Sequence, residues 1–200
     1  SWRESRRGIA KVVTGGGKSF FGMQCLHSCL SQFNQLRTFI VVPTTALRDQ
    51  WVMDLEADLE VPRNVIYSHG TDRKLIDEHR IVVMVVNSAR TRVKEFTSNG
   101  SWMLIADECH RVASIENRRA LEGEWVATLG LSATPERQYD EYFNEVLIPK
   151  LGPIISNYSY VQALSDDVIS PFDLHNFSIP LTVEEEEEIQ KLTLRILIER

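Results

Sequence analysis

Short apolar runs alternate with longer segments of helical periodicity along most of the chain. The candidate strands are Gly8–Val13, Phe39–Val42, Val65–Tyr67, Ile81–Val86, Trp102–Ala106 and Trp125–Leu131. Several of these runs lack polar alternation, which is typical of strands covered by helices on both faces. Between them, Lys18–Phe33 and Thr45–Leu59 are predicted helices, because an apolar residue recurs about once per turn. The pattern predicts an α/β domain with a mainly parallel central sheet flanked by helices.

The pattern changes after Leu131. We predict a helix over Tyr139–Leu151 that stops at Gly152-Pro153, and one or two helical turns over Tyr158–Leu164. Pro171–Pro180 is predicted to be extended.

A last helix is predicted to begin near Val183. Thr182 and Glu185 have the spacing of a capping box at its start. The acidic run Glu184–Glu188 complements the positive end of the helix dipole, and we interpret it as a solvated helix start.

The chain has 200 residues, of which 43% are hydrophobic and 25% are charged. This composition suits one buried core with a short appendage. No apolar run is long enough to cross a bilayer, and no signal-peptide pattern opens the chain. A net charge of −6 argues against a generally basic nucleic-acid-binding surface but leaves room for a few loop contacts. The chain begins without Met and ends inside a predicted helix, so we expect a longer protein.

The 3 cysteines are Cys25, Cys29 and Cys109. Without a secretory signal, they favour reduced thiols in an intracellular compartment, cytoplasmic or nuclear. Cys25 and Cys29 with His27 between them resemble zinc ligands, but on a helix His27 points away from the two thiols. Ordinary helix packing is therefore the preferred interpretation.

A glycine-rich turn joins the first predicted strand to the first long helix: Thr14-Gly15-Gly16-Gly17-Lys18-Ser19. Such a turn lets backbone N–H groups converge on an anion. Lys18 supplies a charge for the β- and γ-phosphates of ATP, and Ser19 supplies a hydroxyl for Mg²⁺. Val12 stands where the general phosphate-loop pattern has its first glycine. The alternative is a glycine turn followed by an unrelated Lys-Ser pair.

The strand at Trp102–Ala106 leads into Asp107-Glu108-Cys109-His110. Ligands of open α/β sheets gather at the carboxyl ends of the strands, so we expect this tetrad to face the glycine loop. Asp107 is predicted to hold the metal through water, and Glu108 to orient and deprotonate the attacking water. Two alternatives are a helix cap formed by Asp-Glu and a nucleophile–base pair formed by Cys109 and His110. We expect Cys109 only to fill space.

Ser132-Ala133-Thr134 follows the last predicted strand at the same edge of the sheet. The hydroxyls of Ser132 and Thr134 are predicted to couple to His110 and to report the state of the γ-phosphate. Alone, this tripeptide is equally consistent with a simple turn.

Taken together, these motifs resemble superfamily 2 helicases of the DExH kind. Thr14–Ser19 is similar to motif I, Pro43–Leu47 to motif Ia, Asp107–His110 to motif II and Ser132–Thr134 to motif III. The strings VVPTTALRDQW and IADECHRV look closest to restriction-subunit and DNA-repair translocases. The resemblance implies a RecA-like lobe that uses ATP and Mg²⁺.

By the same resemblance, nucleic acid, with DNA favoured over RNA, is the expected partner. The implied backbone contacts are Pro43, Thr44, Arg48, Gln50 and a second loop at Asn87 and Ser88. These contacts would position a strand without reading its sequence. The alternative for Pro43-Thr44 is that it only starts a helix.

The resemblance also implies parts that this chain lacks. Residues 1–165 are expected to form an N-terminally truncated first lobe, because no adenine-recognising Gln precedes Lys18. Residues 166–200 are expected to form a crossover strand and helix that lead to a second RecA-like lobe. An arginine finger in that lobe can contribute about 10³-fold or more to turnover, so the chain alone should hydrolyse ATP poorly.

Two other classes of function compete with a motor lobe. A different phosphate-loop enzyme, such as a small-molecule kinase or a GTPase, would give no role to motif Ia or to Ser132-Ala133-Thr134, and a guanine-reading N-K-x-D string does not occur. A non-catalytic lobe with the same fold would not need Lys18, Ser19, Asp107 and Glu108.

Overall fold

The computed structural model describes residues 2–68, 79–136 and 142–173, and beyond these 175, 177, 182, 185–189, 191 and 192. The chain divides into two compact units, Ser1–Ile169 and Ser170–Arg200. The first unit contains the sheet, the helices that cover it and the four helicase-like motifs identified above. Among the described residues, no helix combines the length and apolar character that a membrane span requires.

The central sheet has seven strands in the order β3-β4-β2-β5-β6-β1-β7. Every pairing among them is parallel. The strands are β1 (Arg7–Val12), β2 (Leu36–Val42), β3 (Ile66–Tyr67), β4 (Ile81–Val85), β5 (Ser101–Asp107), β6 (Trp125–Ser132) and β7 (Ile154–Tyr158). The predicted α/β fold with a parallel sheet is confirmed, and each predicted strand corresponds to one of β1 to β6.

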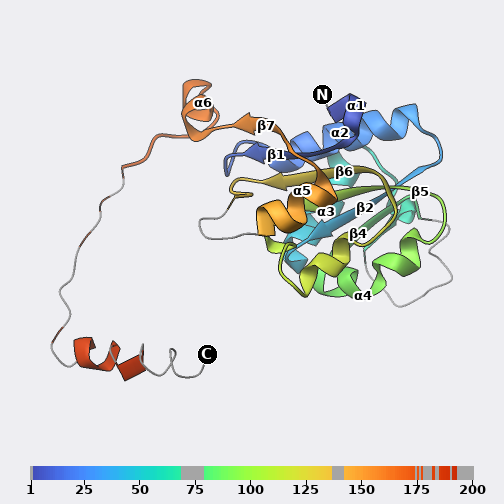
Figure 1. Ribbon diagram of the computed structural model, residues 1–200. Helices are drawn as coiled ribbons and strands as arrows, with labels where there is room; N and C mark the ends of the chain where they lie inside the picture. Colours follow the sequence, from blue (N-terminus) through green and yellow to red (C-terminus); the bar gives the residue numbers. More distant parts are fainter. Residues whose placement is uncertain are drawn as a thin grey trace. The chain divides into compact units, whose positions relative to one another are not determined.

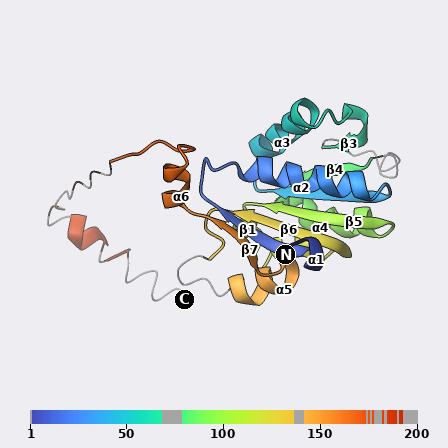
Figure 2. The ribbon, with the colours of Figure 1, turned by 90° about the horizontal axis from the view of Figure 1, so that it is seen from above.

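Helices cover both faces of the sheet (Figures 1 and 2). α2 (Lys18–Gln32) and α3 (Thr45–Asp58) pack on one face. The other face is covered by α4 (Val86–Thr97), the 3-10 turn η4 (Asn117–Leu121) and α5 (Ile148–Leu151). The remaining elements are α1 (Trp2–Ser5), η1 (Arg63–Val65), η3 (Cys109–Arg111), the π-helical turn η5 (Phe143–Leu147) and α6 (Tyr160–Ser165).

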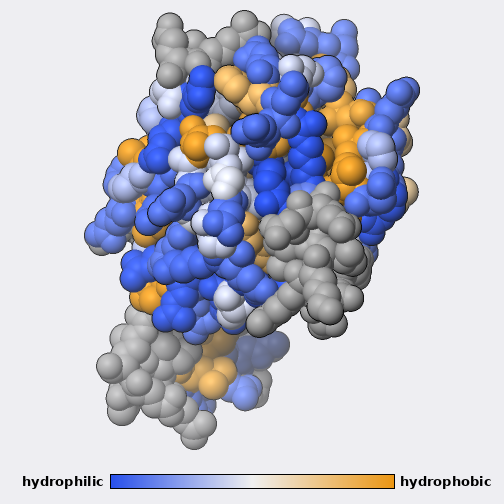
Figure 3. Space-filling view, turned by 90° about the vertical axis from the view of Figure 1, so that its right-hand side faces the viewer, coloured by the Kyte–Doolittle hydropathy of each residue, from blue (hydrophilic) through white to orange (hydrophobic). Residues whose placement is uncertain are grey.

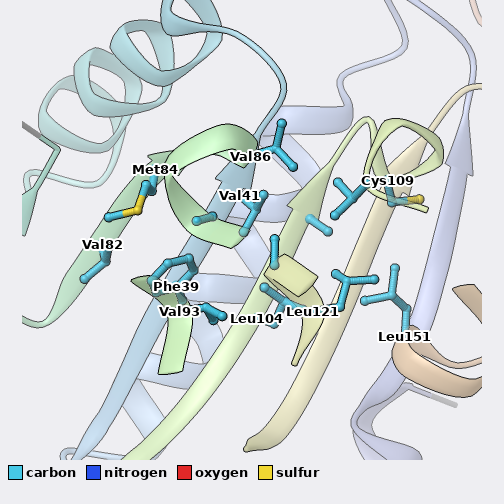
Figure 4. Close-up of a cluster of buried hydrophobic side chains, with 14 of the residues drawn as sticks. Phe39, Val41, Val82, Met84, Val86, Val93, Leu104, Cys109, Leu121 and Leu151 are labelled. Carbon is cyan, nitrogen blue, oxygen red and sulfur yellow. The ribbon is translucent and has the colours of Figure 1, made fainter. Parts of the chain in front are cut away.

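Successive residues of the central strands point into two separate cores. In β2, Phe39 and Val41 face the layer of α4, whereas Ile40 and Val42 face α2 and α3. Figure 4 shows the first of these cores, in which Phe39 lies near Val82 and Val93. Full burial of such a side chain contributes about 1.5–3 kcal/mol to the stability of the fold. The two cores therefore stabilise the sheet from both of its faces. On the coloured part of the face drawn in Figure 3, hydrophilic residues predominate, and hydrophobic residues gather in smaller patches.

The region after β6 differs from the prediction. The described part of the predicted helix at Tyr139–Leu151 consists of η5 followed by α5, and residues 137–141 lie outside the described residues. The predicted stop is confirmed, because Gly152 ends α5 with φ 104°. Ile154–Tyr158 forms β7, an edge strand beside β1 that the sequence pattern did not predict. The predicted helical turns after Tyr158 correspond to α6.

The described residues of the second unit contain the predicted capping box. The Thr182 N–H donates to Glu185 Oε2 at 2.8 Å, and the Glu185 N–H donates to Thr182 Oγ1 at 3.3 Å. These two bonds form the predicted capping box, which satisfies N–H groups at a helix start. Much of Pro171–Pro180, together with Val183 and Glu184, lies outside the described residues.

Candidate functional site

The register of the parallel strands brings four strand ends to one edge of the sheet. Asp107 of β5 pairs with Leu131 of β6, and Ser132 of β6 pairs with Lys11 of β1. On the other side of β5, Ala106 pairs with Val41 of β2. The loops after β1, β2, β5 and β6 therefore start close together, at the edge where open α/β sheets bind ligands.

The glycine loop between β1 and α2 has the backbone of an anion cradle. Gly15 and Gly17 have φ values of 80° and 83°, a left-handed conformation that glycine adopts without a steric cost. Gly17 is the N-cap of the 15-residue helix α2, and no described side chain caps that helix. Its first N–H groups and the positive end of its dipole are thus available to an anion.

The side chain of Lys18 lies beside the tetrad Asp107-Glu108-Cys109-His110. Its Nζ atom is 3.5 Å from Glu108 Oε1, and the two side chains are 11% and 26% exposed. The other oxygen of this carboxylate, Oε2, is 3.5 Å from His110 Nδ1. His110 Nδ1 lies 2.8 Å from Ser132 Oγ, and this hydroxyl also accepts the Thr134 N–H at 3.1 Å. The predicted contact between His110 and Ser132 is confirmed, and one polar chain links the loops that follow β1, β5 and β6.

Asp107 is the buried carboxylate of the site, with 2% of the residue exposed. The Trp51 indole N–H donates to its Oδ2 at 2.8 Å, and the Glu108 N–H donates to its Oδ1 at 2.9 Å. Burial is the largest influence on this group and raises the pKa of Asp107, although both hydrogen bonds oppose the rise. A cation beside this carboxylate would offset the cost of burying its charge.

A cavity of about 400 Å³ adjoins this carboxylate. Its lining includes Gly15, Gly17, Lys18 and Ser19 from the glycine loop and the start of α2, together with Asp107 and Glu108. The hydroxyl of Ser19 and the carboxylate of Asp107 are the oxygen ligands that Mg²⁺ prefers, and Mg²⁺ uses one or two protein oxygens beside substrate phosphates and waters. The residues present therefore fit a magnesium–phosphate group.

Glu108 has an unusual backbone conformation, with φ 46° and ψ 50°. A residue other than glycine in this left-handed region costs of order 1 kcal/mol, and such strain is concentrated at functional sites. The turn sends the next residue, Cys109, into the core, where it is 0% exposed (Figure 4). The predicted space-filling role of Cys109 is confirmed, and burial raises the pKa of its thiol far above the ordinary range.

The zinc alternative is not supported by the side-chain positions on α2. Cys29 is buried, whereas His27 is exposed on another face of the helix. Burial also raises the pKa values of Cys25 and Cys29, which is unfavourable for thiolate ligands.

A second cavity, of about 420 Å³, extends the site toward the loop after β2. Its lining combines Thr14, Glu108, His110 and Thr134 with Pro43, Thr44 and Arg111. Thr44 also caps α3, because its Oγ1 accepts the Leu47 N–H at 3.2 Å. The helix-start interpretation of Pro43-Thr44 is thus correct, and the same residues also border the site. A larger cavity of about 820 Å³ lies at the opposite edge of the sheet, where β2 and β5 begin.

The remaining predicted nucleic-acid contacts lie in other surroundings. Arg48 forms an ion pair with Asp49 at 2.8 Å, and Gln50 lines the cavity of the glycine loop. The prediction of a second loop at Asn87 and Ser88 is wrong, because α4 begins at Val86 directly after β4 ends. Buried Val86, Ala89, Val93 and Phe96 recur at helical spacing, a signal that could have revealed this helix.

Trp51 and Arg111 belong to the site but were not expected there from the sequence. Trp51 belongs to the apolar stripe of α3, and nothing in the local pattern indicates that its N–H reaches Asp107. Arg111, which follows the tetrad Asp107-Glu108-Cys109-His110 directly, borders the second cavity. The placement of Trp51 depends on a contact between segments that are 56 residues apart.

Comparisons with known proteins show the family to which this chain belongs. The family model of the type III restriction enzyme res subunit matches residues 2–137. A protein of African swine fever virus, named as an ATP-dependent RNA helicase, is 27% identical over 143 residues, 70% of this chain and 27% of its own length. A protein of Haloarcula marismortui, named as a DNA helicase, is 26% identical over 155 residues, which cover 76% of this chain and 23% of its own length.

Among solved structures, the UvsW helicase of bacteriophage T4 superimposes with a TM-score of 0.61 at 22% identity, covering 76% of this chain and 54% of that one. This chain spans about a quarter of the length of the viral and the Haloarcula relatives. It belongs to the family of the type III restriction enzyme res subunit, as a first RecA-like lobe of the superfamily 2 helicase type.

Proposed function

We propose that this chain is the ATP-binding lobe of a nucleic-acid-dependent ATPase motor, a helicase or translocase. The observation that carries the proposal is the meeting of Lys18, Asp107 and Glu108 at one edge of the sheet, within the cavity behind the glycine loop. Two separate segments contribute to this arrangement, the glycine loop after β1 and the end of β5, and a triphosphate with its metal needs both.

Each residue has a distinct part in the proposed reaction. The N–H groups of Thr14–Gly17 and the start of α2 bind the phosphates, and Lys18 neutralises the β- and γ-oxygens. Ser19 and Asp107 hold Mg²⁺, which supplies charge stabilisation for the transferred phosphoryl group. Glu108 orients the attacking water and takes its proton, and its contact with Lys18 keeps the carboxylate at the site.

The polar chain beyond Glu108 provides a route for coupling. His110 touches both Glu108 and Ser132, and Ser132 in turn accepts from the Thr134 backbone. A change in the γ-phosphate position alters the surroundings of Glu108, and these contacts pass the change to the loop after β6. Motors of this kind close two lobes on a strand and reopen them after hydrolysis.

Nucleic acid is the proposed partner, with DNA favoured, and a second RecA-like lobe of the same protein completes the site. Pro43 and Thr44 are the best supported contacts, because they border the cavity that continues from Glu108 and His110. Arg48 is already paired with Asp49, and Gln50 lines the cavity beside the glycine loop, so both are weaker candidates. Asn87 is exposed at the start of α4 and stays a candidate on a helix rather than a loop. Of the two relatives, one is named as an RNA helicase and the other as a DNA helicase.

The test is the ATPase rate of the full-length protein, titrated separately with double-stranded DNA, single-stranded DNA and RNA at one fixed salt concentration. The proposal expects stimulation by at least one nucleic acid, and loss of nearly all turnover in Lys18→Ala. Lys94→Ala is the matched control, because this exposed lysine pairs with Glu122 away from the site. Equal rates for wild type and Lys18→Ala would refute the catalytic role. The isolated 200-residue chain is expected to turn over poorly.

A further inference from the structure

Trp51 connects the helix after β2 to the buried carboxylate of the site. Its ring is 1% exposed within α3, and its Nε1–H donates to Asp107 Oδ2 at 2.8 Å. The second carboxylate oxygen accepts the Glu108 N–H at 2.9 Å. Because each carboxylate oxygen has two acceptor positions, both donors can stay in place while Asp107 also binds a metal-bound water.

The indole ring itself is held in place from the other side. A Cβ atom added to Gly22 would lie 3.0 Å from Trp51 Cη2 and 2.8 Å from Leu131 Cδ1. The backbone of α2 therefore approaches the ring as closely as a glycine allows. Since α2 begins with Lys18 and Ser19, the ring packs between the helix of the glycine loop and the acidic strand end.

Packing alone does not explain this hydrogen bond. A buried indole N–H requires an acceptor, and a backbone carbonyl satisfies it, as Asn99 O does for Trp102 at 2.7 Å. Trp51 instead uses a carboxylate that has itself lost most of its hydration, and a charge-assisted bond of this kind is stronger than one to a neutral carbonyl. It also fixes the direction of the carboxylate plane.

We infer that Trp51 is a positioning residue for magnesium: its indole N–H orients the Asp107 carboxylate toward the metal. This inference rests on the proposed function, because it requires that Asp107 and Ser19 hold Mg²⁺ with a nucleotide. Partners of metal ligands typically influence metal affinity by 10- to 100-fold or so. Trp51 thus joins α3, which begins directly after the proposed nucleic-acid contacts Pro43 and Thr44, to the metal side of the nucleotide site.

The test is calorimetric binding of a non-hydrolysable ATP analogue to the full-length protein, once with Mg²⁺ and once with EDTA. In Trp51→Phe, the gain in affinity on adding Mg²⁺ is expected to fall about tenfold, while the affinity in EDTA stays unchanged. Trp102→Phe is the matched control, because it removes a buried indole whose acceptor is remote from the site. If the Phe variant does not fold, Trp51→Met makes the same comparison with a long apolar side chain that carries no hydrogen-bond donor.

Asp107→Asn and the double variant separate the possible outcomes. The inference expects Asp107→Asn to abolish the Mg²⁺-dependent gain and the double variant to be no weaker than Asp107→Asn alone. Two results would overturn the role of Trp51 and leave the metal site intact. One is an unchanged Mg²⁺-dependent gain in affinity in Trp51→Phe. The other is a double variant that binds the analogue about tenfold more weakly than Asp107→Asn. Should Asp107→Asn itself keep the gain, the metal site of the proposed function would be wrong.

Discussion

His110 Nδ1 and Ser132 Oγ lie 2.8 Å apart and thereby connect the loop after β5 to the end of β6. Replacing Ser132 with Ala removes this contact and the acceptor of the Thr134 N–H. Because a hydrogen bond of this type contributes about 0.5–1.5 kcal/mol, we expect nucleic-acid-stimulated ATPase to fall up to about tenfold. The rate without nucleic acid should change less.

The measurement for Ser132→Ala is the ratio of stimulated to unstimulated ATPase rates. Ser98→Ala is a suitable control, because that exposed hydroxyl donates to the nearby Glu95 carbonyl at 3.2 Å, away from the site. An equal fall in both rates would show that Ser132 supports the chemistry or the fold and does not serve coupling.

Glu108→Gln should separate nucleotide binding from hydrolysis. The amide keeps the size of the side chain but cannot take a proton from water, and general-base catalysis typically contributes 10²- to 10⁴-fold or so. We expect ATPase to fall by about that factor, while binding of the Mg²⁺–ATP complex remains within roughly threefold of wild type. Glu122→Gln, at the exposed partner of Lys94, provides the control. Normal turnover in Glu108→Gln would exclude Glu108 as the base.

The left-handed backbone of Glu108 predicts a difference between two inactive variants. Glycine adopts φ 46° freely, whereas alanine does not, so Glu108→Gly should be more stable than Glu108→Ala by about 1 kcal/mol. Comparing an Ala with a Gly at one position holds the loss of the carboxylate constant. Thermal or urea unfolding of both variants measures the difference. An Ala variant as stable as the Gly variant would mean that the turn relaxes and stores no strain.

The motifs and most of the sheet follow from local patterns, and the structure shows where such patterns are insufficient. The runs around Phe39 and Trp102 are apolar enough to indicate buried strands, and the glycine loop indicates its own turn. The edge strand β7 was missed because its residues are only partly buried, and its position depends on pairing with β1, which is more than 140 residues away. Local periodicity does not contain such pairings.

Within the site, the residue types and the contact between His110 and Ser132 were predictable, but the contact of Asp107 with Trp51 was not. Asp107 and Glu108 could be assigned from the strand that precedes them, since parallel strand ends meet at one edge. The contact of Trp51 with Asp107 requires the register of α3 against β5, and an apolar stripe gives only the buried face. Asn87 and Ser88 were misplaced because the polar residues of α4 obscured its apolar spacing.

Thiol reactivity gives a prediction with a defined pH dependence. Burial, followed by the neighbouring Cys29, raises the pKa of Cys25 from 9.0 to about 11. Only the thiolate reacts with iodoacetamide, so at pH 8 the reactive fraction of Cys25 should be about 100-fold below that of an ordinary thiol. Its alkylation should accelerate about tenfold per pH unit up to pH 10.

Peptide mapping by mass spectrometry measures this labelling, with guanidinium-unfolded protein as the fully reactive reference. Cys109, at 0% exposure, should remain unlabelled while the protein is folded. Rapid labelling of Cys109 in the folded protein would revive its interpretation as a nucleophile and contradict the core placement.

The most direct test of the central claim is a crystal structure of the protein with Mg²⁺ and a non-hydrolysable ATP analogue. We predict that the β- and γ-phosphates lie against Gly15–Gly17 and Lys18, with the metal between Ser19 and Asp107. Phosphates bound elsewhere, or a metal without contact to Asp107 directly or through water, would contradict the account.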